Sequence, residues 1–429
     1  MRPLYFALAI VAACGHDSNT TMPDAGRGVD APRADAAASA DASPDAPAVG
    51  LVSASVIQNG VPQVGVHVLF NNADSSLVAD IMTDANGSAS QQMAAGGFVT
   101  AIGPFPLAST ADMYTVADVQ PGDQLVFAQT VPVTGGGSVS VTTALVPNAA
   151  TYLMNSPCAG GSLTPLSDRA IGGLVTSGCT TTGFIIVAAD GSGAPLASLY
   201  DPSLTVPFGS AFTLDLTAEA YEPAQTATYT VAHVPGTSVT VAYGVYSAQG
   251  FLGSTGTFGP LSAGSASLTL QHLSAAGLTG AVTTSYATNL GGFRITDWLD
   301  GGSDYTLDAA ALQLPGFETT AVYDLFRQTI TWTPRGGTAA PDLVRAQVSF
   351  TGDDNFHWRI VAPYTGGSIT FPVLAGHTPA LDDRFTLNDL EVVQVTGGWN
   401  AYRARLVATP TLSASPYLTS TPGRLIIAE

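Results

Sequence analysis

The chain has 429 residues, of which 46% are hydrophobic and only 10% charged, and its formal net charge is −19 at pH 7. A chain of this length is longer than one ordinary domain, so two or three domains are expected. Acidic residues outnumber basic ones by 32 to 13, and without a basic stripe such a chain repels a phosphate backbone. The composition therefore argues against nucleic-acid binding.

The N-terminus has the layout of an export signal. Arg2 supplies a positive charge, residues 4–13 form an apolar run, and small residues precede Cys14. The run is too short for a transmembrane helix, which needs roughly 20 residues. VAAC at residues 11–14 resembles the bacterial lipobox, which implies that residues 1–13 are a lipoprotein signal peptide and that Cys14 is lipidated. A cleaved signal of a soluble exported protein is the alternative.

Residues 14–49 follow the apolar run and are dominated by Asp, Ala, Pro and Ser. Such a segment cannot build a core and is expected to be a disordered tether. Together with the anchor, it predicts an exported cell-envelope protein whose partner is the membrane, reached through the lipid. Gly15 directly after the cysteine resembles outer-membrane sorting, so we expect an outer-membrane lipoprotein.

From residue 50 onward, short apolar or alternating runs are separated by Gly, Pro, Asn and Asp. FTLDLTAEAY (212–221) and SLTLQHL (267–273) alternate as half-buried strands do, and GFIIVAAD (183–190) is typical of a strand buried on both faces. We therefore predict an all-β fold of two or three tandem β-sandwich domains, Ig-like or transthyretin-like.

A weak internal repeat supports this modular organisation. YTVADVQPGD at residues 114–123 recurs as YTVAHVPGT at residues 229–237. The spacing predicts sandwich units at 50–147 and 148–280, followed by a C-terminal β domain at 281–429.

The first unit carries a family resemblance. GVPQVGVHVLF (60–70), TDANGSAS (83–90) and AAGGFVTAI (94–102) resemble carboxypeptidase regulatory-like domains, and nearly as much invasin-type bacterial Ig-like repeats. The resemblance implies a β-sandwich that serves as a spacer, stalk or binding module, with a hairpin turn at the TD-x-x-G segment. It implies no catalytic residues, and the rest of the chain is unassigned.

Two cysteines remain once Cys14 is lipidated. An exported protein is expected to pair them, so we predict a disulfide between Cys158 and Cys179. Its loop of about 22 residues would stabilise the fold by roughly 3 kcal/mol in the loop-entropy model. Two separate buried thiols are the alternative.

Two segments offer oxygen ligands that calcium could use. DWLDGGSDYTLD places four carboxylates within one short stretch, those of Asp297, Asp300, Asp304 and Asp308. A solvated acidic loop is the alternative there. TDANGS around Asp84 offers further oxygens, but Asn-Gly is also the strongest short turn signal, and the turn is favoured. Calcium is thus the one cofactor considered, and otherwise none is expected.

Aromatic residues gather in the last third of the chain, which contains all four tryptophans: Trp298, Trp332, Trp358 and Trp399. Exposed tryptophans would stack on a carbohydrate or anchor a protein ligand. Burial in a sandwich core is the alternative, and it is favoured.

Catalytic signatures are missing from the sequence. The histidines are scattered, and there is no HExxH, G-x-S-x-G or CxxC motif. The sequence favours a lipid-anchored protein that displays β-sandwich modules for binding, adhesion or spacing and does not catalyse a reaction. The alternative is an extracellular polysaccharide-acting hydrolase, with two facing carboxylates in its C-terminal domain.

Overall fold

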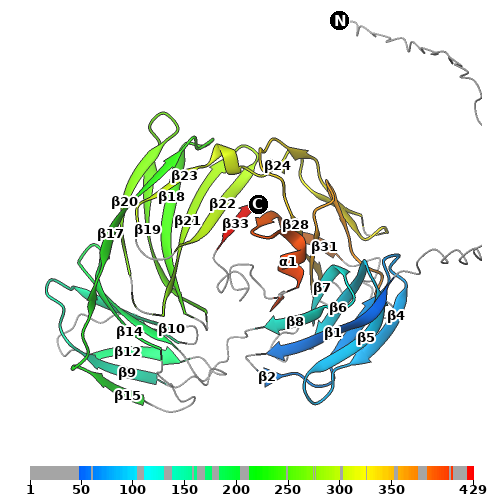
Figure 1. The fold of residues 1–429 in the computed structure, drawn as a ribbon, viewed down its shortest axis with the longest axis horizontal. Helices are drawn as coiled ribbons and strands as arrows, with labels where there is room; N and C mark the ends of the chain where they lie inside the picture. Colours follow the sequence, from blue (N-terminus) through cyan, green and yellow to red (C-terminus); the bar gives the residue numbers. More distant parts are fainter. Residues whose placement is uncertain are drawn as a thin grey trace, which may run out of the picture. The chain divides into compact units, whose positions relative to one another are not determined.

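The computed structural model describes residues 48–58, 61–103, 111–129, 138–156, 159–161, 170–175, 183–202, 212–247, 250–273, 275, 277–299, 303–324, 326–351, 356–374, 384–404, 407–408 and 423–429. The chain divides into two units, Met1–Ala46 and Pro47–Glu429, and the described residues belong to the second. They confirm the all-β fold (Figure 1). Helical structure in these ranges is limited to α1 (Gly398–Arg403) and a 3-10 turn at Ala310–Leu312.

The largest sheet has twelve strands, in the order β19 (Gly250–Pro260), β18 (Ser238–Ser247), β21 (Thr279–Thr288), β22 (Gly291–Leu299), β33 (Arg424–Ala428), β31 (Arg384–Val395), β28 (Leu343–Thr351), β29 (Phe356–Pro363), β7 (Ala111–Val119), β6 (Gly97–Gly103), β3 (His67–Asn71) and β4 (Leu77–Met82). An eight-stranded sheet has the order β15 (Phe212–Leu216), β9 (Ser138–Thr143), β12 (Ala170–Val175), β11 (Ala159–Gly161), β10 (Thr151–Ser156), β13 (Phe184–Ala189), β14 (Pro195–Asp201) and β16 (Glu222–Pro223).

Four smaller sheets complete the described structure. The first contains β2 (Val61–Pro62), β1 (Val49–Gln58), β8 (Gln124–Gln129) and β32 (Val407–Ala408), with β5 (Ser88–Ala94) paired to β1. The second has the order β20 (Ala266–His272), β17 (Gln225–Ala232) and β23 (Tyr305–Asp308). The others are β24 (Gly316–Phe317) with β27 (Pro334–Arg335), and β25 (Val322–Asp324), β26 (Thr329–Thr331) and β30 (Ser368–Thr370).

β33 lies in the middle of the twelve-stranded sheet, between β22 and β31 (Figure 1). It has the sequence RLIIA, and its last four residues are buried. Because strand side chains alternate between faces, both faces of the sheet must be covered here. The last described strand therefore joins segments that are far apart in the sequence.

Three hydrophobic clusters form the cores. One face of the twelve-stranded sheet contributes Val241 and Trp358 to a cluster shared with Tyr229 of β17. The opposite face contributes Phe70 to a second cluster, which Phe127 of β8 completes. A third cluster lies on the eight-stranded sheet. The period-2 alternation thus sends neighbouring residues of one strand into different cores.

The strand predicted at 183–190 is confirmed as β13, and all six of its residues are buried. The repeated segments coincide with β7 and β17. Asp118 and His233, which hold the same position in the two copies, both adopt a left-handed backbone, with φ of 52° and 54°. The repeat therefore has a shared local geometry as well as a shared sequence.

The turn predicted at TDANGS is confirmed. The Asp84 carboxylate accepts hydrogen bonds from the backbone N–H groups of Asn86 and Ser88, at 2.8 and 2.9 Å, and Gly87 takes a φ of 70°. The expected hairpin pairing is wrong, because β4 belongs to the twelve-stranded sheet and β5 pairs with β1. The turn carries the chain from one sheet to the other, around the cluster that contains Phe70 and Phe127.

Strand pairing crosses both positions at which domain boundaries were expected. β9, just before 147/148, pairs with β12 and β15, and β17, before 280/281, pairs with β23. The boundaries therefore stay predictions about sequence modules, and they do not coincide with breaks in strand pairing.

Candidate ligand-binding site

The four tryptophans, for which burial in a core was favoured over an exposed stacking surface, are all buried, with exposed fractions of 0 to 8%: Trp298, Trp332, Trp358 and Trp399. The Trp358 indole N–H donates to Thr115 Oγ1 at 2.8 Å, and that of Trp399 donates to Asp118 Oδ2 at 2.9 Å. The rings therefore pack in cores, and the idea that they form an exposed carbohydrate-stacking surface is corrected.

Asp297, the first aspartate of the predicted calcium cluster, holds two strands together. Arg424 Nε and Nη2 donate to its two carboxylate oxygens, at 2.6 and 2.9 Å, and the Tyr305 hydroxyl donates to it as well. Burial, followed by this hydrogen bond, raises the pKa of Tyr305, and the bond to Asp297 raises the pKa of Arg424. The Asp297 carboxylate thus has a structural role.

The other described members of the cluster have separate partners. Asp304 accepts a hydrogen bond from the Thr228 backbone N–H at 2.8 Å, and Asp308 pairs with His233 at 3.0 Å. No three His, Cys, Asp or Glu side chains among the described residues are grouped so that they could hold a metal ion. Asp300 lies outside the described residues, as do Cys14, Cys158 and Cys179.

A pocket of about 520 Å³ lies between the eight-stranded sheet and the strands β17, β18, β19 and β20. Its lining residues come from the eight-stranded sheet, from β18 and β19 of the twelve-stranded sheet, and from β17 and β20 of a three-stranded sheet. Leu153 of β10 and Ile185 of β13 form one wall, and Leu252 of β19 and Leu270 of β20 form the other. The Thr255 hydroxyl of β19 donates to the backbone carbonyl of Gln271 in β20 at 2.9 Å. This hydrogen bond connects the two strands of the second wall.

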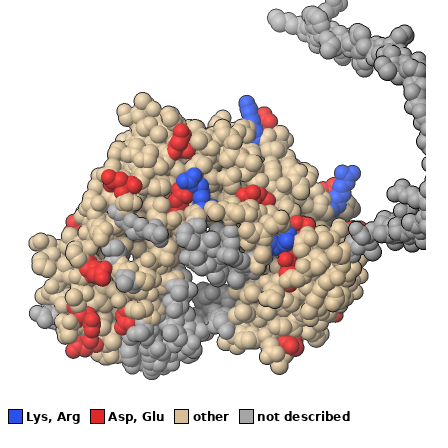
Figure 2. Space-filling view, in the orientation of Figure 1, with Lys and Arg blue, Asp and Glu red and all other residues tan. Residues whose placement is uncertain are grey.

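The pocket lining combines aliphatic side chains with uncharged hydrogen-bonding groups. The polar members are Ser192, Ser254, Thr226, Thr255, Thr257, Thr269, Asn155 and Gln271, and no Asp, Glu, Lys, Arg or His is among the described lining residues. In Figure 2 most of the visible surface is likewise neither acidic nor basic. An apolar cavity with a few polar groups that fix orientation is the usual form of a small-molecule site.

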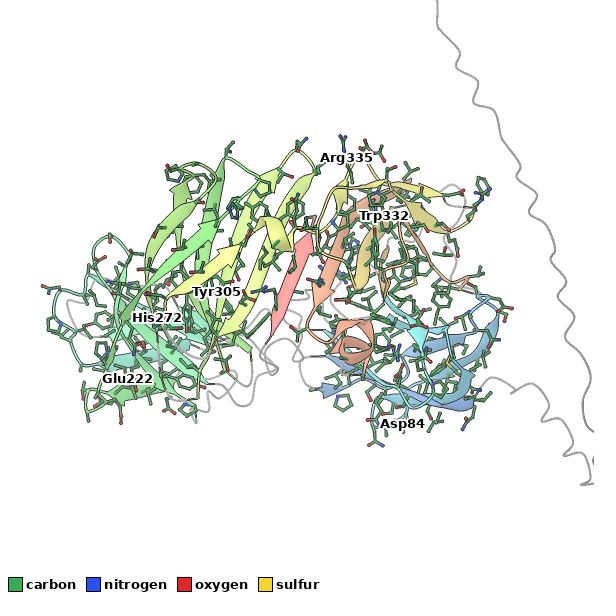
Figure 3. The ribbon with its side chains drawn as sticks, turned by 45° about the horizontal axis from the view of Figure 1, so that its top comes forward. Asp84, Glu222, His272, Tyr305, Trp332 and Arg335 are labelled. Carbon is green, nitrogen blue, oxygen red and sulfur yellow. The ribbon has the colours of Figure 1, made fainter. Side chains whose placement is uncertain are left out.

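Gln271 supplies this pocket with a hydrogen-bond acceptor that would orient a bound ligand. Its Oε1 atom is buried and has no hydrogen-bond partner in the described structure, while its neighbour in β20, His272 (labelled in Figure 3), is fully buried against Tyr243. A buried acceptor without a partner costs roughly 1–3 kcal/mol. A ligand that donates a hydrogen bond to Gln271 would recover part of that cost.

Asp190 shapes one edge of the pocket. Its carboxylate accepts hydrogen bonds from the Ser192 hydroxyl and N–H, at 2.6 and 2.8 Å, and from the Ala194 N–H at 3.0 Å. These bonds, the Ser192 hydroxyl first, lower the pKa of Asp190. The ionised carboxylate thus fixes the β13–β14 turn, whose residues line the pocket.

A cluster of polar side chains lies on the twelve-stranded sheet, around Ser349 and His357. Ser349 Oγ lies 2.6 Å from His357 Nδ1 and also accepts a hydrogen bond from Asn388 Nδ2. His357 lies opposite Asp112 in the parallel pairing of β29 and β7. Sequence reasoning missed this group, although LVRAQVSF (343–350) carries polar residues at alternate positions, because such positions are normally solvent-facing.

Sequence reasoning also missed the pocket. Its lining residues come from six strands and a turn spread over residues 153–273, and none of them belongs to a short motif. No local pattern in the sequence marks them.

No protein-family model matches the chain, and no curated protein sequence matches it. Among solved structures it is similar to the Bacillus anthracis TIE protein, with 12% identity over 61% of this chain and 50% of that one, and a TM-score of 0.17. A putative adhesin from Bacteroides ovatus has 9% identity over 61% of this chain and 92% of its own, with a TM-score of 0.18.

A tetra-tandem repeat from the extending region of a large adhesion protein has 14% identity over 81% of this chain and 95% of its own, with a TM-score of 0.12. This chain spans about half the length of the Bacillus anthracis protein. TM-scores this low establish no shared fold. In the part that the structure describes, no helix is both long and apolar enough to cross a membrane.

Proposed function

We propose that this chain is an exported, lipid-anchored β protein that binds a neutral, amphiphilic ligand in the pocket between the eight-stranded sheet and β17–β20. The anchor is Cys14, and Cys158 and Cys179 form a disulfide. The tether ends before residue 49, where it was expected to end, because Val49 is the first residue of β1. The single observation that supports the binding role is the chemistry of the described pocket lining, which combines aliphatic side chains, uncharged polar groups and the buried, unpartnered Gln271 Oε1.

The pocket lining disfavours a charged ligand. An ionised group moved into an apolar site without a partner carries a large desolvation cost, and the part of the lining that the structure describes offers no counter-charge. The aliphatic side chains of Leu153 and Ile185 in one wall and of Leu270 in the other suit an alkyl or similar apolar body. The hydroxyl groups and Gln271 suit a hydroxylated end that donates a hydrogen bond.

Octyl glucoside below its micelle concentration is a suitable probe, because it joins an alkyl chain to a neutral, hydroxylated head. Calorimetric titration should show saturable binding to the wild-type protein. Thr226→Trp, at an exposed lining position, should fill the pocket and abolish binding. Thr320→Trp is the matched control, because Thr320 is exposed and lies away from the pocket. Equal binding by both variants, or no binding by the wild type, would contradict the proposal.

Ester hydrolysis is a second candidate function, favoured by the contact between Ser349 and His357. Asn388 donates to Ser349 Oγ, and in the His357 tautomer that leaves Nδ1 unprotonated the Ser349 hydroxyl donates to Nδ1, at 2.6 Å. This is the arrangement in which a histidine accepts the proton of a serine nucleophile. Asp112, opposite His357, would support the imidazolium that forms.

A fluorophosphonate reagent tests this second function. Attack would form a bond between Ser349 Oγ and phosphorus and break the P–F bond, with the serine proton passing to His357 and fluoride leaving. Peptide mapping should find the label on Ser349 in the wild type, and no label in Ser349→Ala or His357→Ala. An unlabelled Ser349 in the wild type would count against hydrolysis.

A further inference from the structure

We propose that a second pocket, at the junction of β14, β15 and β16, binds a primary ammonium group carried on an alkyl chain. The pocket has a volume of about 450 Å³. It is formed by residues 198–202 at the end of β14, by residues 216–222 between β15 and β16, and by Ala275. None of these residues lines the uncharged pocket, so the two proposals stand or fall separately.

The described lining of this pocket carries only negative charge. Three carboxylates line it, those of Asp201, Glu219 and Glu222, and no Lys, Arg or His is among the lining residues that the structure describes. Within the described residues, no ion pair is found for Glu219 or Glu222. In Figure 2 the region of β9, β14 and β15 shows acidic atoms and no basic ones, and Figure 3 labels Glu222 there. Grouped acidic side chains attract a cation.

A buried hydroxyl gives independent support for a ligand here. Ser198 lines the pocket and is only 1% exposed, and its Oγ has no hydrogen-bond partner in the described structure. Buried polar side chains are normally satisfied. Since Ser198 lies opposite Glu222 in the pairing of β14 with β16, one ammonium group placed between them would donate to both.

The shape of the site favours an organic cation over a metal ion. The three carboxylates do not come together as a group able to hold a metal, so a compact ion could not contact all of them. Leu199, Leu216 and Tyr200 also line the pocket. Apolar side chains and an aromatic ring accommodate an alkyl stem, and a ring face also attracts a cation.

The experiment uses the whole exported protein and calorimetric titration at low ionic strength with 1,5-diaminopentane. The wild type should bind it saturably, and the neutral isostere 1,5-pentanediol should not bind. The double variant Glu219→Gln/Glu222→Gln should bind at least about tenfold more weakly, because it loses two charge-assisted contacts. Ser198→Ala should weaken binding less. Glu318→Gln, at an exposed carboxylate elsewhere, is the matched control and should bind as the wild type does.

A parallel titration with Nα-acetyl-lysine methylamide distinguishes a free amine from a lysine side chain as the source of the ammonium group. Binding of either probe with the same dependence on Glu219 and Glu222 supports the proposal and identifies the source. Equal affinity of the double variant, binding of the diol, or no binding of either amine by the wild type would overturn it. Circular dichroism checks that each variant keeps the strand signal of the wild type.

Discussion

Asp297 and Arg424 face each other across β22 and β33 and form a two-point ion pair, with nitrogen–oxygen distances of 2.6 and 2.9 Å. The Asp297 side chain is 7% exposed and that of Arg424 is 39% exposed. The pair fixes the first residue of β33, the strand that joins β22 to β31 in the middle of the largest sheet. An aspartate that the sequence suggested as a calcium ligand therefore holds the sheet together.

Removal of Arg424 should destabilise the protein, because Asp297 would keep a buried charge without its partner. Arg424→Ala should lower the free energy of unfolding by about 2–3 kcal/mol, less than the roughly 3–5 kcal/mol of a fully buried pair, since Arg424 is partly exposed. Urea unfolding gives the measurement. Arg327→Ala is the control, because its pair with Asp324 is exposed and 3.7 Å long, and a change below about 0.5 kcal/mol is expected. Equal effects of the two substitutions would contradict the role of Asp297.

The repeated segments allow a matched comparison of two left-handed residues. Asp118→Ala and His233→Ala both place alanine at a positive φ, which costs roughly 1 kcal/mol. Only Asp118 also holds α1, through Trp399 at 2.9 Å and Arg403 at 3.3 Å. Asp118→Ala should therefore lower the free energy of unfolding by about 1–3 kcal/mol more than His233→Ala does. A larger loss of stability in His233→Ala would contradict the role of Asp118 in holding α1.

Acid should loosen the turn that borders the uncharged pocket. The Ser192 hydroxyl and the backbone N–H groups hold the pKa of Asp190 below its ordinary value of 3.8. Since the folded-state pKa is lowered, the stabilisation is present above pH 3.8 and is lost as the pH falls through the folded value. Between pH 5 and a pH below the folded-state pKa of Asp190, the free energy of unfolding should fall less in Asp190→Ala than in the wild type. An NMR titration that gives Asp190 a pKa at or above 3.8 would contradict this.

The lipid anchor is tested in the bacterial cell. Cys14→Ala should leave the chain in the soluble exported fraction, whereas the wild type should partition with membranes. Palmitate labelling of the wild type, absent in the variant, identifies the lipid. A Cys14→Ala protein that still sediments with membranes would show that another feature attaches it.

The predicted disulfide can be read directly from the mature protein. Non-reducing peptide mapping should find Cys158 and Cys179 in one linked pair of peptides. Alkylation of both thiols without prior reduction would instead favour two separate thiols.

The sequence predicts features that depend on neighbouring residues, and it does not predict those that depend on residues far apart in the chain. The buried strand β13 and the turn at Asp84 were predictable, because hydrophobic pattern and turn chemistry are local. The separation of β4 and β5 into two sheets was not, since the same turn can serve a hairpin or a crossover. The pairing of β33 between β22 and β31 depends on partners more than 25 residues away.

The candidate sites show the same limit. Aspartates close in sequence, such as Asp297 and Asp304, take separate partners because Asp297 lies in β22 and Asp304 directly precedes β23, which belongs to another sheet. The residues that do share a pocket, such as Leu153 and Gln271, are distant in the chain. Their common property is an absence of charge, and in a chain with so few charged residues that property marks no position.

The side-chain amide of Gln271 offers the most direct test of the binding proposal. In an NMR titration with octyl glucoside, its resonances should shift saturably, and Thr226→Trp should abolish the shift. The amide resonances of Gln347 should stay unchanged. This residue lies in β28 of the twelve-stranded sheet, and its Oε1 accepts a hydrogen bond from Arg359 at 2.7 Å. A Gln271 signal that does not respond, or that responds equally in Thr226→Trp, would contradict the assignment of this pocket as the ligand site.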